Sequence, residues 1–122
     1  MADTERTGQR LVTALEELIA AAPSLSAPPP IMLPDPSGLE LDTVTLPRDA
    51  FLGAAENVWA ADAAGRVSAE QITPYPPGIP AIIPGERITA EVIDYLRTGL
   101  QAGMVLPDPA DPTLKTIRVT AA

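Results

Sequence analysis

The sequence predicts an α+β fold, in which two main helices pack against a small mixed or antiparallel sheet. Apolar side chains recur at helical spacing over residues 4–22 and again over 89–102. Elsewhere the chain has short apolar runs bounded by proline and glycine, a pattern typical of short strands. The 122 residues have room for one domain. We therefore expect an amphipathic helix at 1–22, a proline-rich connector at 23–38 and a folded domain at 39–122.

The first helix has a clear apolar face that ends at a proline. Its stripe consists of Leu11, Leu15, Leu18 and Ala22, widened by Val12 and Ile19. Pro23 ends the helix because proline lacks the N–H that a helix interior needs. The following segment, PSLSAPPPIMLPDPSG, is too restricted for a helix and too poor in N–H donors for a central strand. We expect it to act as an extended spacer.

The middle of the chain predicts short strands around one turn of helix. Pro47 presets the first φ of a helical turn that we expect to reach Leu52. The last apolar run, LKTIRVT, alternates so that Lys115, Ile117 and Val119 share one side, as in a half-buried strand. The segments expected to form the sheet are 39–46, 57–60, 67–72, 81–83 and 115–120.

The segment ITAEVIDYLRTGLQAG predicts the second main helix. Thr89 is suited to cap its start and Gly103 to follow its end. Its acidic residues near the start favour the positive end of the helix dipole. The expected apolar stripe is Val92, Ile93, Leu96 and Leu100.

Between these elements, the run TPYPPGIP at residues 73–80 predicts a rigid loop. Each proline fixes its own φ and favours an extended conformation in the residue before it. The nearby Pro84-Gly85 pair suits the centre of a type II turn, where glycine accepts the positive φ. Both features are expected to hold polar groups, chiefly Tyr75 and Glu86, in fixed positions.

Composition excludes several classes of function. The net charge of −8, with one lysine and seven arginines, disfavours binding to nucleic acids or anionic membranes. The sequence has no cysteine, which fits a reducing compartment, and no secretory signal or membrane-spanning segment is recognisable. We therefore expect a soluble, cytoplasmic protein.

The sequence offers no catalytic, cofactor-binding or metal-binding residues. It has neither histidine nor cysteine, which removes triads, histidine acid–base pairs and ordinary zinc sites. The scattered glycines do not form a phosphate-binding loop. Asp108 and Asp111 in PDPADP are expected to form turns rather than a metal site.

The block GRVSAEQITPYPPGIPAIIPGE and the helix after it, from Gly65 to Gly103, resemble the C-terminal domain of the ornithine/lysine/arginine decarboxylases. This family depends on pyridoxal phosphate (PLP) and has fold type I. Upstream, LPRDAFLGAAENVWAADAAG is similar to the usual start of that domain, and the likeness continues weakly through GMVLPDPADPTLKTIRV. The first 38 residues match only loosely.

The resemblance implies a non-catalytic part of a decarboxylase. The family joins PLP to a lysine that follows a histidine, in a large catalytic domain that precedes this one. Lys115 has no histidine neighbour, so a solvated strand lysine is favoured over a Schiff base. We expect no cofactor in this chain and no activity alone. The implied partner is the PLP-binding catalytic domain, with self-association as an alternative.

The resemblance also suggests a surface near the active-site entrance or the interface of a dimeric enzyme. Glu86 either attracts a cationic substrate there or caps the start of the next helix. The Tyr75 hydroxyl either faces the entrance or the ring packs against prolines. Arg66 and Arg87 are expected to make ion pairs at the surface or between domains. The candidate residues are Tyr75, Pro76, Pro77, Gly78 and Glu86.

A second hypothesis treats the proline-rich segments as ligands. Pro74 to Pro80, or the connector from Pro28 to Pro36, would then bind an SH3-like or WW-like domain as a stand-alone interaction module. Ile79, Ile82 and Ile83 argue against this for the loop, because a displayed peptide would leave them exposed. Slow amide exchange across residues 74 to 84 would identify a buried loop.

Overall fold

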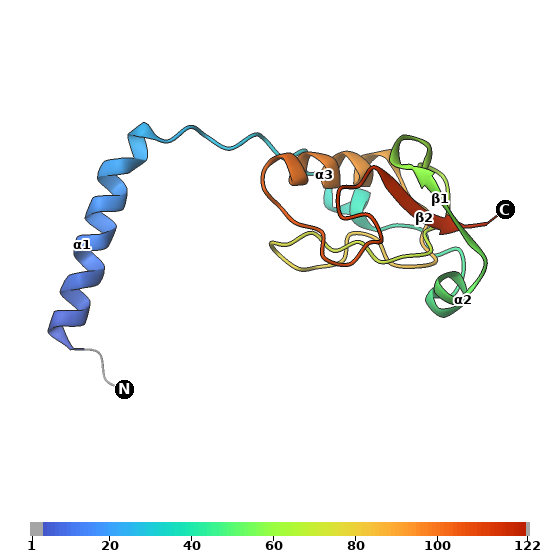
Figure 1. The fold of residues 1–122 in the computed structure, drawn as a ribbon, viewed down its shortest axis with the longest axis horizontal. Coiled ribbons are helices and arrows are strands. Elements are labelled where there is room, and N and C mark those ends of the chain that lie inside the picture. Colours follow the sequence, from blue (N-terminus) through green and yellow to red (C-terminus); the bar gives the residue numbers. More distant parts are fainter. Residues whose placement is uncertain (1–3, 122) are drawn as a thin grey trace.

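The computed structural model describes residues 4–121, and Figure 1 shows two separate parts. Helix α1 stands apart from a globular body and is joined to it by an extended connector (Figure 1). We call residues 39–121 the body. In chain order the helices and strands are α1 (Glu5–Ala21), α2 (Pro47–Leu52), β1 (Ala55–Trp59), α3 (Ala90–Gln101) and β2 (Thr116–Thr120), with 3-10 turns at Ala22–Ser24, Pro36–Leu39 and Ala60–Asp62.

The core lies between α3, the β1–β2 pair and the irregular segments beside them. Strands β1 and β2 are antiparallel, with Ala55 opposite Thr120 and Trp59 opposite Thr116. Ile117 and Val119 of β2 point into the core, which confirms the predicted alternation within the strand. Lys115, which was predicted to share their side, is exposed because it precedes β2. The buried cluster consists of Ala63, Ile72, Ile82, Ile88, Val92, Tyr95, Leu96, Leu106, Leu114, Ile117 and Val119.

Three of the predicted strand segments pair only through isolated bridges. Residues 67–72 and 81–83 form the two sides of an irregular hairpin, bridged at Val67–Arg87 and Ile72–Ile82, while 39–46 contributes the single bridge Thr43–Glu86. Prolines on both sides of the hairpin remove ladder donors, so a continuous sheet cannot extend through it. The antiparallel sheet is confirmed, but it contains two strands.

Helix α3 has the predicted caps and the predicted inward face. The Thr89 side chain accepts a hydrogen bond from the Val92 amide at 3.2 Å. Gly103 has φ +97°, as expected for the residue after a helix end. Val92 and Leu96 are fully buried, and Ile93 and Leu100 are half-buried. Tyr95 and Gly99 are also buried, which the predicted stripe did not include.

The expectation that the first helix packs against the sheet is wrong. Helix α1 forms as predicted, with Thr4 as its cap, but it has no buried residue. The reason lies in the connector, which the Met32 amide fastens to Thr98 of α3 at 2.9 Å. Ahead of this point the prolines hold the chain extended, and α1 lies away from the body.

Candidate interaction surface

Glu70 is a buried carboxylate that fastens the resemblance block to the end of the chain. One oxygen accepts a hydrogen bond from the Arg118 amide at 2.6 Å, and the other from the Ala110 amide at 2.8 Å. Only 5% of the residue is exposed. Sequence reasoning did not assign Glu70 a role, since the spacing gives no sign that residues 40 and 48 positions away meet it. Its role is structural.

The neighbouring residues of the block also serve the fold. Ser68 exchanges hydrogen bonds with the Glu70 backbone, at 2.7 Å to the carbonyl and 3.3 Å from the amide. Arg66 pairs with Glu56 at 2.6 Å and donates to the Thr120 carbonyl, which confirms its expected ion pair. Arg87 differs from expectation, because it donates to the Gly65 carbonyl at 2.8 Å.

The proline loop is anchored at Tyr75 and presents its tip to solvent. The Tyr75 and Val105 backbones exchange two hydrogen bonds, at 2.9 and 3.0 Å. Gly78 has φ +83°, and a Cβ there would lie 3.3 Å from the Tyr75 ring, so the ring lies over this glycine. Tyr75, Ile79 and Val105 are 60%, 68% and 56% exposed. We call these three residues the loop-tip surface.

The expected burial of the loop isoleucines is only partly correct. Ile82 is fully buried, and Ile83 is half-buried. Ile79 is mainly exposed because it lies at the tip of the loop. The last bridge of the hairpin, which joins Ile72 and Ile82, comes before the tip. Pro76, Pro77 and Gly78 are exposed beside it. The loop therefore has one anchored side and one accessible apolar side.

Glu86 lies at the other end of the hairpin from Tyr75. Its carboxylate accepts a hydrogen bond from the Ile83 amide at 2.8 Å and so closes the Pro84-Gly85 turn. Gly85 has φ +92°, as predicted, and a Cβ there would lie 2.3 Å from the Thr45 carbonyl. Among residues 4–121, no hydrogen bond or backbone bridge joins Glu86 to the loop tip. Helix α3 is capped by Thr89 instead.

Asp111 forms a turn, as predicted, because the Leu114 amide donates to its carbonyl at 3.0 Å, whereas the Asp108 side chain accepts a hydrogen bond from the distant Gln71. Asp111 accepts hydrogen bonds from Thr113, Lys115 and Thr116, and these bonds, led by the Thr113 hydroxyl, hold its pKa well below the usual range. The pKa of Asp108 is lowered by hydrogen bonds, chiefly with Thr73 and secondly with Gln71. No group of three or more potential metal ligands occurs within the part of the chain that the structure describes.

An open depression of about 550 Å³ lies beside the block, but its charged groups are already engaged. It is lined by Phe51, Glu70, Gln71, Asp108, Ala110 and Arg118. Arg118 donates to the Ala69 carbonyl at 2.7 Å and lies 5.8 Å from the centre of the Phe51 ring. Glu70 and Asp108 bind protein groups. The depression therefore lacks a free pair of groups for acid–base chemistry.

Comparison with known proteins identifies the family. A family model described as the C-terminal domain of Orn/Lys/Arg decarboxylase matches residues 40–108. The chain belongs to this family. It is 38% identical over 120 residues to an arginine decarboxylase of Bacillus anthracis and 39% identical to one of Bacillus subtilis, and each match covers 96% of this chain. The chain spans about a quarter of the length of these relatives, 24% in each case.

The structural comparison agrees with the family. The constitutive lysine decarboxylase of Escherichia coli superposes with a TM-score of 0.51 and 26% sequence identity, over 69% of this chain and 14% of that one. The Orn/Lys/Arg decarboxylase C-terminal domain family therefore accounts for both the sequence block and the α+β body. Among residues 4–121, no helix is both long and apolar enough to cross a bilayer.

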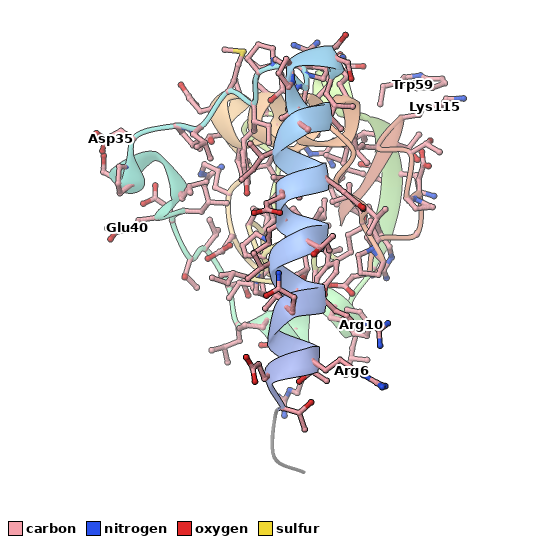
Figure 2. The ribbon with its side chains drawn as sticks, turned by 90° about the vertical axis from the view of Figure 1, so that its left-hand side faces the viewer. Arg6, Arg10, Asp35, Glu40, Trp59 and Lys115 are labelled. Carbon is pink, nitrogen blue, oxygen red and sulfur yellow. The ribbon has the colours of Figure 1, made fainter. Side chains whose placement is uncertain are left out.

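The residues of this Orn/Lys/Arg decarboxylase domain do not fit the PLP of the full-length family. Lys115 is exposed and lies just before β2, where its carbonyl accepts a hydrogen bond from the Ala60 amide. Figure 2 shows its side chain at the surface near Trp59. A Schiff-base lysine needs a desolvated site or a neighbouring group that lowers its pKa. Lys115 is exposed to solvent instead.

The two proline-rich segments differ in whether they are free to act as a ligand. In the loop, backbone hydrogen bonds of Ile72, Tyr75 and Gly78 fix the chain to the body or to itself, which disfavours a displayed peptide. Residues 25–30 of the connector are exposed and lie outside any helix or strand. Only the connector is available to an SH3-like or WW-like domain in this conformation.

Proposed function

We propose that this chain is the non-catalytic C-terminal part of a PLP-dependent decarboxylase of a basic amino acid. Its family and its arginine decarboxylase relatives support this assignment. It acts either within a longer chain or as a small subunit, in the cytoplasm and in amino-acid and polyamine metabolism. The cofactor and its chemistry belong to the catalytic part, since this chain has no suitable lysine.

The loop-tip surface is the proposed contact with the catalytic part near the entrance of a dimeric enzyme. The observation that carries this proposal is its combination of exposure and rigidity: Tyr75 and Val105 are fixed by two backbone hydrogen bonds, yet their side chains are accessible. An ordered apolar surface loses little conformational entropy on binding. Aromatic side chains such as Tyr75 are also common at the centres of interfaces.

Glu86 keeps a proposed second role as a negative charge near the substrate's path. Its carboxylate closes a turn through one oxygen, and the chain as a whole carries a net charge of −8. A field of this sign attracts the cationic side chain of a basic amino acid. Because Glu86 lies away from the loop tip, this effect is separate from docking and needs its own test.

The docking proposal is tested in a chimera of the Bacillus subtilis arginine decarboxylase, in which this chain replaces the stretch that it matches. Changing both Tyr75 and Ile79 to serine is expected to lower kcat/KM roughly 10-fold or more, because an apolar anchor is lost. Leu52→Ser, at an exposed apolar residue of α2, is the matched control and is expected to leave activity unchanged. Equal activity of all three proteins would overturn the docking role.

The entrance charge is tested in the same chimera with Glu86→Gln. We expect a higher KM for the cationic substrate at low salt, and a difference that shrinks as the ionic strength rises, since salt screens charges beyond about 10 Å at 0.1 M. A loss of stability above about 1 kcal/mol without any salt-dependent kinetic effect would leave Glu86 as a turn residue alone.

A further inference from the structure

Helix α1 carries an apolar face that nothing within residues 4–121 covers. Leu11, Leu15 and Leu18 lie on one side of the helix, and Val12 and Ile19 widen that side. These residues are exposed, at between 46% and 70% of their surface. A helix of 17 residues is marginal alone in water, so this face calls for a partner.

The comparisons indicate where that partner lies. The family model begins at residue 40, after α1 and the connector. The match to the Bacillus arginine decarboxylases covers 96% of this chain, so it includes most or all of α1. Those relatives are about four times as long, since the chain spans 24% of each. The α1 sequence is therefore shared with proteins that have a large further surface available to cover it.

The charges of α1 define the chemistry of the site that fits it. With 100° between successive residues, Arg10 lies beyond the Leu18 edge of the apolar face and Glu16 lies beyond its Val12 edge. Arg6 lies on the face opposite the apolar residues. Figure 2 shows Arg6 and Arg10 projecting to the same side of the helix. A complementary groove is apolar at its floor, with a carboxylate at the Arg10 edge and a cation at the Glu16 edge.

The connector limits how far this groove lies from the body. Its fixed point is the hydrogen bond from Met32 to Thr98, next to the half-buried Ile31. Residues 25–31 are extended and contain Pro28, Pro29 and Pro30. At about 3.1 Å per residue this stretch spans roughly 20 Å, which bounds the distance from the end of the helical segment to α3.

We propose that α1 is a second docking element, which inserts its leucine face into an apolar groove on the catalytic part of the decarboxylase, within reach of the connector. This proposal rests on the proposed function and adds a separate contact to it. The loop tip and α1 lie in different parts of the molecule, so a substitution can remove one docking contact without the other (Figure 1).

The test compares amide exchange of α1 in the isolated chain and in the Bacillus subtilis chimera. We expect exchange over residues 11–21 to be at least about 100-fold slower in the chimera, because docking adds an opening step to a helix that is otherwise marginal. Changing Leu11, Leu15 and Leu18 to serine is expected to remove this protection. The matched control changes Arg6, Thr13 and Ala20, on the opposite face, to serine and is expected to keep it.

The remaining outcomes separate this proposal from the proposed function. Slower exchange of the Ile79 amide in the chimera than in the isolated chain, without protection of α1, overturns the second docking element and leaves the docked loop. Protection of neither region counts against both. Protection of α1 in the isolated chain that rises with concentration, together with dimers seen by sedimentation, would mean that the apolar face of α1 binds a second copy of the chain. That result overturns the proposal. Should the chimera not fold, the same measurement is made on the Bacillus subtilis enzyme, where fast exchange of the segment aligned with α1 also overturns it.

Discussion

Helices α1 and α3 begin alike and end in different environments. Each starts at a threonine with nearly the same backbone angles, φ −105° and ψ 158° at Thr4 and φ −104° and ψ 159° at Thr89. Each has an apolar stripe. Yet α3 buries Val92, Tyr95, Leu96 and Gly99, whereas α1 buries nothing. Local sequence therefore specifies a helix and its apolar face. Whether that face is buried depends on tertiary contacts with the rest of the chain.

The largest expected difference between the two helices is in the free energy of unfolding. Leu96→Ala in α3 is expected to cost roughly 2–5 kcal/mol, because Leu96 is 1% exposed and its loss leaves a cavity. Leu15→Ala in α1 is expected to cost the isolated chain less than about 0.5 kcal/mol. Urea unfolding of the two variants measures both. Similar losses would mean that α1 packs on the body in solution.

A smaller effect is expected at Glu70, which joins the block to the last strand. Glu70→Gln leaves one side-chain oxygen for two backbone amides, those of Ala110 and Arg118, and is expected to cost about 2 kcal/mol. The control is Glu56→Gln, which removes an exposed carboxylate paired with Arg66 and is expected to cost less than about 1 kcal/mol. If both variants unfold at the same urea concentration, the buried carboxylate adds nothing beyond a surface pair.

The pH dependence of stability is expected to separate the body from the connector. In the folded chain the pKa of Asp111 is lowered by the hydrogen bonds from Thr113 and its neighbours, so its stabilisation is present above the unfolded pKa and is lost as pH falls through the folded one. Asp35, in the connector, also has a lowered pKa, but its bonds reach only Ser37, whereas those of Asp111 reach Lys115 and Thr116 at the start of β2 in the body.

We therefore expect Asp111→Asn to be less stable than the wild type above about pH 5 and to approach it below about pH 3, whereas Asp35→Asn follows the wild type throughout. Thermal unfolding between these pH values measures the difference. If the difference in stability between the wild type and Asp111→Asn is the same at every pH, the turn does not depend on the charge of Asp111.

The sequence predicted most local features correctly because short-range chemistry determines them. Thr89, Gly103 and the Pro84-Gly85 turn have the expected roles, since each depends on a few neighbouring residues. The position of α1 and the partners of Glu70 were not predictable in this way. Glu70 meets amides 40 and 48 residues away, and such pairing follows from the path of the whole chain.

The candidate surface shows the same division. Reading Tyr75 and Glu86 as one presented site assumed that a short separation in sequence keeps them together. The hairpin places them at different ends instead, with Tyr75 bridged to Val105 and Glu86 to Thr43. The family resemblance located the right block, but it did not show which of its residues hold the fold and which remain accessible. That distinction depends on burial and hydrogen bonding in three dimensions.

The smallest expected effect is the most direct test of the comparison between α1 and the body. Removing residues 1–24 takes away α1 and the turn after it but keeps Ile31, Met32 and the hydrogen bond to Thr98. Because α1 has no buried residue, the free energy of unfolding of the body is expected to change by less than about 0.5 kcal/mol, the usual range for surface changes. Removing residues 1–34 is the matched comparison, since it also takes the half-buried Ile31 and Pro34 away from α3. That deletion is expected to cost roughly 1–3 kcal/mol. Urea unfolding, followed by the fluorescence of Trp59 in the body, measures both chains. A loss of more than about 1 kcal/mol in the shorter deletion would mean that α1 stabilises the body and that the two parts are not energetically separate.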